Sequence, residues 1–497
     1  MIGPNAKIAA YCGGGSAALK PYYAITPFDG ISKQGVDVKY SVGCHAHKML
    51  PALGTSLKSH DGKVGLTFKA FTSPASEKDR QPVDVLHLTD SNMYLADYYH
   101  PKLTEDLWWA EVEAIFTPDE DCDFEFGLTV FGTAKLYIDG ELLVDNETKQ
   151  RNGGSFFNVG TVEETGIKSV TAGTNYNIKV VYASGVTSKL VNPDGVVSFG
   201  GGGIRIGGAR VISPEEEIQK AVELAKSVDQ VVLCMGLNSD FEQEGHDRQH
   251  MDLPGLSNDL ISAVAAVNPR TVVILQSGTP VSMPWANSVA GIVQAWYGGN
   301  ETGNAIADVL FGDVNPSGKL PLSFPVHVED NPAFLNYKSE RGRVLYGEDI
   351  YIGYRFYELT KRTTQFSFGW GLSYTSFALS NLQVVSGEKI TVSVAVENTG
   401  AVDGSEVVQV YVSQRSPSIN RAKKELKGFS KVYVKRGESL VTEITFERKY
   451  ATSFWDEERD QWIEEAGVYD VLVGNCCAHT PLKGSFEVGE TSWWSGL

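Results

Sequence analysis

Basic residues are scarce in this sequence, and long apolar runs are missing. The 497 residues include 43 Lys and Arg against 61 Asp and Glu, so the net charge at pH 7 is -18. This balance argues against nucleic acid or an anionic membrane as a partner. No apolar run approaches the roughly 20 residues of a membrane span, and no basic, apolar and small-residue succession of a signal peptide opens the chain. We therefore expect a cytoplasmic protein.

Cysteine is also sparse, and its spacing argues against a metal site. The six cysteines form no Cys-x-x-Cys pair, so a zinc knuckle is not predicted; they lie at positions 12, 44, 122, 234, 476 and 477. Cys234 lies in a buried strand pattern, and the adjacent Cys476 and Cys477 are most simply free thiols. We expect neither a metal nor a structural disulfide.

Two short stretches resemble ligand-binding loops, one for phosphate and one for calcium, but their residue spacing fits neither. The glycine-rich stretch 11–19 resembles a phosphate loop, but it lacks both Gly-x-Gly-x-x-Gly and Gly-Lys-Ser/Thr, so we expect a tight loop that needs positive φ. The acidic stretch 118–123 lacks the glycine and distal glutamate of a calcium loop, so we expect a turn that enters a strand.

The periodicity of the chain changes three times. Apolar strands alternate with helical segments before residue 58 and again over 210–326, which predicts an α/β layer. In the first part we expect a short helix or turn and then a strand at 36–42. Between these parts, residues 59–209 alternate apolar and polar side chains, which predicts an inserted all-β unit. Residues 376–488 alternate strictly again, as in a fibronectin type III-like β-sandwich.

One loop concentrates the charged side chains. It follows the buried strand 230–236, and loops at the carboxyl ends of such strands carry the chemistry of open α/β sheets. Five acidic or basic residues lie within nine positions: Asp240, Glu242, Glu244, Asp247 and Arg248. A carboxyl beside an apolar wall there could have a raised pKa and act as a general acid. The simpler alternative is a solvated loop with a surface pair between Asp247 and Arg248.

This loop resembles the acid/base loop of family 3 glycoside hydrolases. The likeness rests on Glu244-Gly-x-Asp-Arg248 and the following Leu253-Pro254, after a strand that ends in Met-Gly-Leu-Asn. Further phrases agree from end to end, among them 298–310 and 366–374. The sequence is most similar to fungal and yeast-type β-glucosidases.

The resemblance implies a retaining β-glucosidase that acts on β-glucosides or oligosaccharides with two carboxyl groups and no cofactor. It assigns the acid/base role to Glu244, with Glu242 as the alternative, and places Asp247 and Arg248 among candidate substrate-binding residues. The nucleophile of the family is an aspartate in a Ser-Asp-Trp-type motif on a preceding barrel domain, and this motif is missing here. We therefore expect the chain to be the distal part of a longer enzyme, to need a barrel domain as partner, and to turn over little alone.

The resemblance also specifies the other parts of the chain. It identifies 59–209 as a protective-antigen-type (PA14-like) β-sandwich inserted into the α/β sandwich domain formed by 1–58 and 210–326. It identifies 327–375 as a wrapping linker. In the family the inserted loops reach over the active site, which makes Phe156 and Phe157 candidate substrate contacts. An equally simple expectation is that one of the two rings is buried and the other incidental.

Two other classes of function remain as alternatives. A non-catalytic carbohydrate-binding fragment, or a degenerate product, would bind sugar with its β-sandwiches, and binding would survive Glu244→Gln. A dinucleotide-binding protein would use the glycine-rich stretch and would be stabilised by its ligand. The sequence leaves open whether the protein forms a homo-oligomer.

Overall fold

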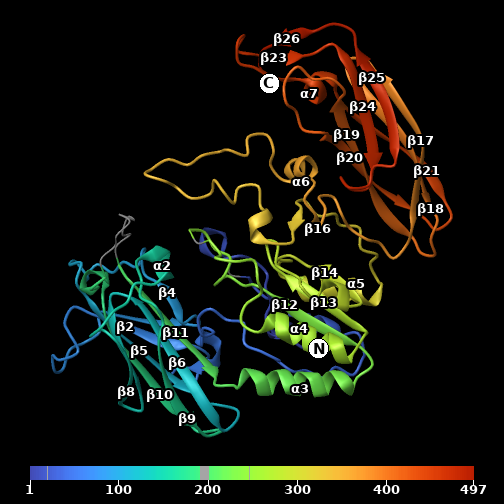
Figure 1. Cartoon of the computed structure of the whole chain (residues 1–497). Coiled ribbons are helices and arrows are strands. Elements are labelled where there is room, and N and C mark those ends of the chain that lie inside the picture. The colour runs from blue at the N-terminus through green and yellow to red at the C-terminus, as the bar shows by residue number, and fades with distance from the viewer. Residues whose placement is uncertain (20, 191–200, 246, 497) are drawn as a thin grey trace.

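The chain folds into two β-sandwiches on either side of an α/β layer. The structure is a computed structural model that describes residues 1–19, 21–190, 201–245 and 247–496. Figure 1 shows the α/β layer in green, one sandwich beside it in blue to teal, and the other sandwich in orange to red. None of the helices in these ranges is long and apolar enough to cross a bilayer.

A parallel sheet, in the order β12-β13-β14, forms the centre of the α/β layer. The first two strands are buried on both faces, as their unbroken apolar runs predict. Helices α3 and α4 pack on one face, while α1 and α5 pack together on the other. The bounds are α1 Pro27–Ser32, α3 Pro214–Lys226, β12 Val231–Gly236, α4 Ser257–Val267, β13 Thr271–Gln276, β14 Gly291–Gln294 and α5 Thr302–Phe311.

The predicted strand at 36–42 is wrong. None of these residues is buried, and among them only Ser41 makes a β-bridge, to Ile2. Ile2 in turn bridges Leu233 of β12 in parallel. The segment therefore lies at the edge of the sheet, where single bridges replace a ladder. The short helix expected before it is present as α1.

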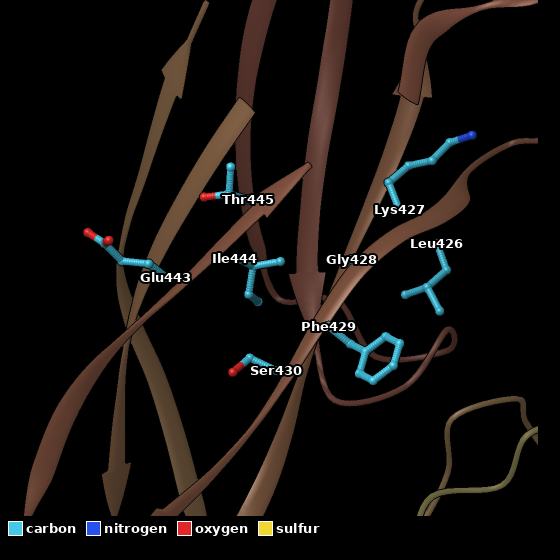
Figure 2. Close-up of a pocket in the computed structure, with 8 residues that line it drawn as sticks. All are labelled: Leu426, Lys427, Gly428, Phe429, Ser430, Glu443, Ile444 and Thr445. Atoms are coloured by element: carbon cyan, nitrogen blue, oxygen red, sulfur yellow. The ribbon is translucent and has the colours of Figure 1, made fainter. Parts of the chain in front are cut away.

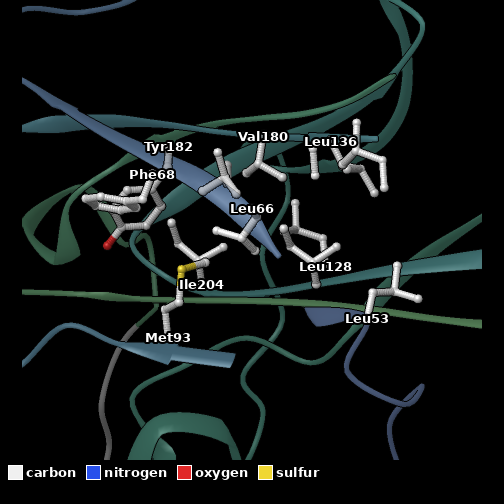
Figure 3. Close-up of a cluster of buried hydrophobic side chains, with 14 of the residues drawn as sticks. Leu53, Leu66, Phe68, Met93, Leu128, Leu136, Val180, Tyr182 and Ile204 are labelled. Carbon is white, nitrogen blue, oxygen red and sulfur yellow. The ribbon is translucent and has the colours of Figure 1, made fainter. Parts of the chain in front are cut away.

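Residues 57–190 and 201–210 form the blue-to-teal sandwich, which consists of two antiparallel sheets. One sheet has the order β3-β2-β5-β10-β7-β8, with β1 beside β5, and the other has the order β4-β11-β6-β9. Alternate residues of both sheets point inward and form one apolar core, part of which Figure 3 shows. The bounds are β1 Leu57–Lys58, β2 Leu66–Phe71, β3 Asp84–Leu88, β4 Asn92–Tyr94, β5 Trp109–Phe116, β6 Cys122–Phe131, β7 Thr133–Ile138, β8 Glu141–Asn146, β9 Glu164–Val170, β10 Tyr176–Ala183 and β11 Gly203–Arg210.

The two connections between this sandwich and the α/β layer lie side by side. The backbone N–H of Leu53 donates to the carbonyl of Ile206 at 3.2 Å, and Ala52 forms a β-bridge with Gly207. The chain therefore enters and leaves the insertion at one place. An insertion with adjacent ends interrupts a host domain at little cost.

The linker and the last sandwich follow the α/β layer. Residues 327–375 contain α6 (Tyr354–Thr360), while β15 (Phe324–Pro325) pairs with β16 (Thr364–Phe366). The part before α6 begins with a short 3-10 helix, Val328–Asp330, and Figure 1 shows the rest of it as a long excursion of the chain. The last sandwich packs the sheet β17-β18-β21 against β20-β19-β24-β25 around its own apolar core. The bounds are β17 Phe377–Ser386, β18 Lys389–Asn398, β19 Gly404–Gln414, β20 Glu425–Val434, β21 Ser439–Glu447, β24 Gly467–Gly474 and β25 Leu482–Val488.

A small tryptophan-rich sheet at the end of the chain has no counterpart in the sequence predictions. It has the order β22-β23-β26, and it follows the short helix α7 (Arg448–Thr452). Trp462 is paired across the strands with Trp455 and with Trp494. Its strands are too short for periodicity to predict; they are β22 Phe454–Asp456, β23 Gln461–Glu464 and β26 Ser492–Trp494.

Candidate active site

The charged loop leaves the carboxyl end of β12, as predicted. Its first residue, Leu237, donates a backbone hydrogen bond to the carbonyl of Gln276 at 2.8 Å, so the loop begins beside the end of β13. Gly245 has φ 78° with open space around it, as a turn at this glycine requires. His246, the variable position of the motif, lies outside the described residues.

Glu244 is an exposed carboxyl that rests on the glycine-rich stretch. Its Oε2 accepts a hydrogen bond from the backbone N–H of Ser16 at 3.2 Å. Hydrogen bonds from the Ser16 side chain and backbone lower the pKa of Glu244. The apolar wall that would raise this pKa is missing from the described part of the chain, since Glu244 is exposed. The side chain of Glu244 is therefore exposed, and its surroundings lower its pKa instead of raising it.

The glycine-rich stretch is packed against the charged loop. Gly14 donates its N–H to the carbonyl of Glu242 at 2.9 Å. Gly15 has φ 68°, and a Cβ at this position would lie 2.8 Å from the Cβ of Glu244. The expected tight loop with positive φ is confirmed at Gly15. The glycines therefore allow the backbone of this stretch to approach the backbone of the charged loop. This role differs from that of the glycines in a phosphate-binding loop.

Glu242, the alternative acid/base residue, is fully engaged with the α/β layer. Its Oε2 accepts the backbone N–H of Gly278 at 2.7 Å, and its carboxylate also accepts the hydroxyl groups of Thr279 and Tyr297. Burial and the Glu242 carboxylate raise the pKa of Tyr297. These bonds fasten the middle of the charged loop to the segments after β13 and β14.

Asp240 points a third way, toward the inserted sandwich. Its Oδ2 lies 3.9 Å from Nη2 of Arg205 on β11, and its carboxylate also accepts a backbone hydrogen bond from Met49. Burial raises the pKa of Asp240, while Arg205 and Lys48 oppose the rise. Three acidic residues at alternate positions thus contact three different parts of the molecule.

Asp247 and Arg248 do not form the surface pair that was one alternative. The Tyr337 hydroxyl of the linker donates to Asp247. Arg248 turns inward and donates from Nη2 to the carbonyl of Pro280 at 2.7 Å. Its Nη1 is buried, and within the described ranges it has no hydrogen-bond partner. Burial lowers the pKa of this guanidinium.

Phe156 and Phe157 lie in a strained turn of the inserted sandwich, labelled α2 (Ser155–Asn158). Both residues have left-handed backbone angles, with φ 52° and 56°. Phe156 stacks on Tyr94 with a ring distance of 5.7 Å and covers Gly203, so this ring is packed. Phe157 is 38% exposed. Left-handed conformations of bulky residues are costly and gather at functional sites.

The acidic stretch 118–123 forms the expected turn into β6. Asp121 accepts the backbone N–H of Ala172 at 2.8 Å, and Asp123 accepts the hydroxyl of Ser169 at 2.6 Å. These carboxylates therefore bind hydrogen-bond donors at the end of the neighbouring strand β9. Within the described ranges, no group of three or more His, Cys, Asp and Glu side chains could hold a metal ion.

A cavity lies between the charged loop and the inserted sandwich. It has a volume of about 440 Å³, and its lining includes Gln243, Leu50, Glu163 and the turn 153–155. A second hollow of about 430 Å³ lies between β20 and β21 of the last sandwich, as Figure 2 shows. Only the first includes a residue of the charged loop.

Several residues of this site escaped sequence reasoning. Arg205, Tyr297, Ser16 and Gly15 come from distant segments, and neither spacing nor periodicity links them to the charged loop. The only available signal was the glycine-rich composition of 11–19.

The fold defines a class of multidomain chain: an α/β layer interrupted by one β-sandwich and followed by a second. The Glycosyl hydrolase family 3 C-terminal domain matches residues 1–374, and the Fibronectin type III-like domain matches residues 406–476. The chain belongs to glycosyl hydrolase family 3.

Named relatives agree with this assignment. Probable beta-glucosidase I of Neosartorya fischeri is 52% identical over the whole chain, and that of Aspergillus niger is 50% identical. The chain spans 60% and 62% of their lengths. A crystal structure of the Kluyveromyces marxianus β-glucosidase in complex with glucose matches all of the chain and 60% of that protein, with a TM-score of 0.94 and 44% identity. A Streptomyces venezuelae β-glucosidase matches 98% of the chain and 55% of that protein, with a TM-score of 0.65 and 26% identity.

Proposed function

We propose that this chain supplies the acid/base part of a retaining β-glucosidase that releases terminal β-D-glucose from glucosides or oligosaccharides. The observation that carries this proposal is the exposure of Glu244 on its loop. Asp240 and Glu242 face the inserted sandwich and the α/β layer, whereas the side chain of Glu244 is exposed and accepts a hydrogen bond from the backbone of Ser16. Membership of glycosyl hydrolase family 3 supports the reaction class.

The chemistry needs a second carboxylate, and the Ser-Asp-Trp-type motif that carries it in the family is missing from this sequence. In a retaining glycosidase, a nucleophilic carboxylate attacks the anomeric carbon while the acid protonates the departing glycosidic oxygen. Glu244 would then accept a proton from the water that releases glucose from the covalent intermediate. We propose that the nucleophile comes from a family 3 barrel domain, since the relatives are longer than this chain.

Docking of that domain would also supply the environment that Glu244 lacks. Burial and a second carboxylate nearby both raise the pKa of a carboxyl group. The hydrogen bonds from Ser16 hold the pKa of Glu244 low in the present structure. Covering Glu244 would reverse this direction and make the residue an acid near neutral pH.

We propose that the inserted unit is a protective-antigen-type sandwich and that Phe157 is its substrate contact. Both rings lie against Tyr94, at 5.7 Å for Phe156 and 5.8 Å for Phe157, but Phe157 is the exposed one of the pair. Asp247 is exposed and could reach a sugar hydroxyl. Arg248 supports the loop by its hydrogen bond to the carbonyl of Pro280.

The proposal is tested with aryl β-glucosides and the Glu244→Ala variant, each assayed with and without a family 3 barrel domain. We expect little turnover without the barrel. In the assembled enzyme, Glu244→Ala should slow an alkyl glucoside far more than a dinitrophenyl glucoside, because a good leaving group needs no proton. Added azide should accelerate the variant by replacing water as the second nucleophile.

Glu242→Ala is the matched control, because it removes a carboxyl from the same loop. We expect it to weaken the loop without dependence on the leaving group and without rescue by azide. If Glu244→Ala lowered the hydrolysis rates of the alkyl and the dinitrophenyl glucoside by the same factor, Glu244 would not be the acid/base residue. Azide rescue of Glu242→Ala would transfer that role to Glu242.

A further inference from the structure

A buried arginine connects the inserted sandwich to the charged loop. Arg205 lies on β11 and is only 4% exposed. Its Nη1 donates to Oε1 of Glu163 at 3.0 Å, and its Nη2 donates to the carbonyl of Leu50 at 2.7 Å. The same Nη2 lies 3.9 Å from Oδ2 of Asp240. One guanidinium therefore contacts the sandwich, the segment that enters it, and the charged loop.

The surroundings of Arg205 are built for this arrangement. Oε2 of Glu163 accepts the backbone N–H of Leu50 at 2.8 Å, so both polar groups of that peptide segment are bound by the pair. A Cβ at Gly127 or Gly207 would lie 2.5 Å or 2.8 Å from Oε1 of Glu163, so these facing glycines leave the room for its carboxylate. A guanidinium presents several donors in a rigid fork, which suits contacts in different directions.

The two carboxylates beside Arg205, those of Glu163 and Asp240, depend on its positive charge more than the partners of an exposed ion pair do. Burial raises the pKa of both Glu163 and Asp240, and Arg205 opposes the rise in each. A buried carboxylate that loses its partner is strongly unfavourable. The ionised carboxylate of Asp240 is therefore stabilised by staying near Arg205. This attraction restrains the loop that carries Asp240.

We propose that Arg205 is a positioning residue for the acid/base loop: through Asp240 it fixes the loop so that Glu244, four residues later, is held in place by the inserted sandwich. The insertion would then have a second role besides contact with substrate. Gln243, which precedes Glu244, lines the same cavity as Leu50 and Glu163, so the loop and the sandwich also share a wall. The catalytic consequence of this inference rests on the proposed function, but the restraint on the loop does not.

The restraint is tested first on the chain itself by hydrogen exchange. We expect Arg205→Met and Asp240→Asn each to speed exchange of the amides of residues 237–248 about tenfold or more, since local opening is governed by the contacts that hold a segment. Arg151→Met is the matched control, because Arg151 makes a two-pronged pair with Glu164 on the same sandwich but is 69% exposed. Unchanged exchange in Asp240→Asn, which leaves the sandwich pair intact, would overturn the proposal even if Arg205→Met failed to fold.

The path through Asp240 is tested by a double-mutant cycle. If Arg205 acts on the loop through Asp240, Arg205→Met should add little to the exchange rate once Asp240→Asn is present. Additive effects would show that Arg205 loosens the loop through the sandwich as a whole, and would overturn the assignment.

The catalytic consequence is measured in the assembled enzyme. We expect Arg205→Met to lower kcat about ten- to a hundredfold, as small misplacements of catalytic groups do, with KM within about twofold. Faster loop exchange with unchanged kcat would overturn the positioning role. If the parent enzyme shows no hydrolysis, the proposed function fails, while the exchange experiment still decides whether Arg205 holds the loop.

Discussion

At the scale of single residues, the charged loop separates carboxylates by what each of them contacts. Asp240, Glu242 and Glu244 are chemically alike, yet one contacts Arg205, one accepts hydroxyl and backbone donors of the α/β layer, and one is exposed. Two of them therefore connect the loop to neighbouring units, and the third is exposed beside the glycine-rich stretch.

Gly15 permits a prediction about the support of Glu244. We expect Gly15→Ala to displace Glu244 and to lower the activity of the assembled enzyme, because the new Cβ would lie 2.8 Å from that of Glu244. Gly35→Ala is the control: Gly35 has a similar φ of 74°, but a Cβ added there would meet no atom within 4 Å. Both variants should lose about 1–2 kcal/mol of stability for the left-handed backbone. Equal activities of the two variants would contradict a supporting role for Gly15.

His47 permits a prediction about pH. Burial and the neighbouring His45 lower the pKa of His47 to about 4, while Glu125 opposes them and Arg205 adds to them. The folded protein therefore holds His47 neutral, whereas the unfolded chain takes up a proton near pH 6.5. Stability should consequently fall as the pH drops from about 6.5 toward 4.

The measurement compares thermal unfolding midpoints at pH 7 and pH 4.5 for the parent and His47→Gln. We expect the variant to lose less stability on acidification, by about 1 kcal/mol after solvent screening is allowed for. His60→Gln, at an exposed position, should behave as the parent does. An identical pH response in His47→Gln would rule out this source of acid sensitivity.

At the scale of elements, the charged loop and its partners in the α/β layer lie at the ends of elements, whereas Arg205 lies within β11. The charged loop follows β12, the bonds to Glu242 come from segments after β13 and β14, and the two phenylalanines occupy the turn before β9. Regular strands and helices supply the rigid frame, and the loops between them supply the functional groups.

The turn that holds Phe157 permits a prediction that separates backbone strain from the aromatic ring. We expect Phe157→Gly to be more stable than Phe157→Ala by about 1 kcal/mol, because only glycine adopts φ near 56° without cost. Both variants lack the ring, so both should raise KM for an oligosaccharide substrate to the same extent. A difference in KM between the two variants would assign the effect to the shape of the turn. KM values equal to that of the parent would show that Phe157 does not contact the substrate. Thermal unfolding and initial-rate kinetics provide the two measurements.

At the scale of the whole molecule, the apolar cores are separate. One core lies within the inserted sandwich, one on a face of the α/β sheet, and one within the last sandwich. The contact of Arg205 with Asp240, which joins the insertion to the loop, is by contrast polar. Units with separate cores can unfold separately.

Calorimetry should therefore show more than one unfolding transition, and core substitutions should shift them one at a time. Val112→Ala removes methyl groups from the core of the inserted sandwich, and Val410→Ala does so in the last sandwich. We expect each substitution to cost about 2 kcal/mol and to lower a different transition by a few degrees. A single transition that both variants shift equally would show that the units unfold together.

Much of the fold could be predicted from the sequence because its elements are strongly patterned. The unbroken apolar runs of β12 and β13 and the strict alternation of β18 and β19 read directly as buried and half-buried strands. The strand expected at 36–42 failed because single bridges at a sheet edge leave no periodic signal that distinguishes them from a ladder. The tryptophan-rich sheet was missed because its strands have three or four residues.

The sequence by itself determined the family resemblance, the order of the units and the loop on which the candidate acid/base residue lies. These follow from local composition, periodicity and motif spacing, which act over a few neighbouring residues. Only the tertiary structure separated Glu244 from Glu242 and Asp240, because their exposure and partners depend on segments more than 30 residues away, such as Gly278 and Arg205. The same holds for the glycine-rich stretch, whose purpose is a close approach between two backbones that meet only when the chain is folded.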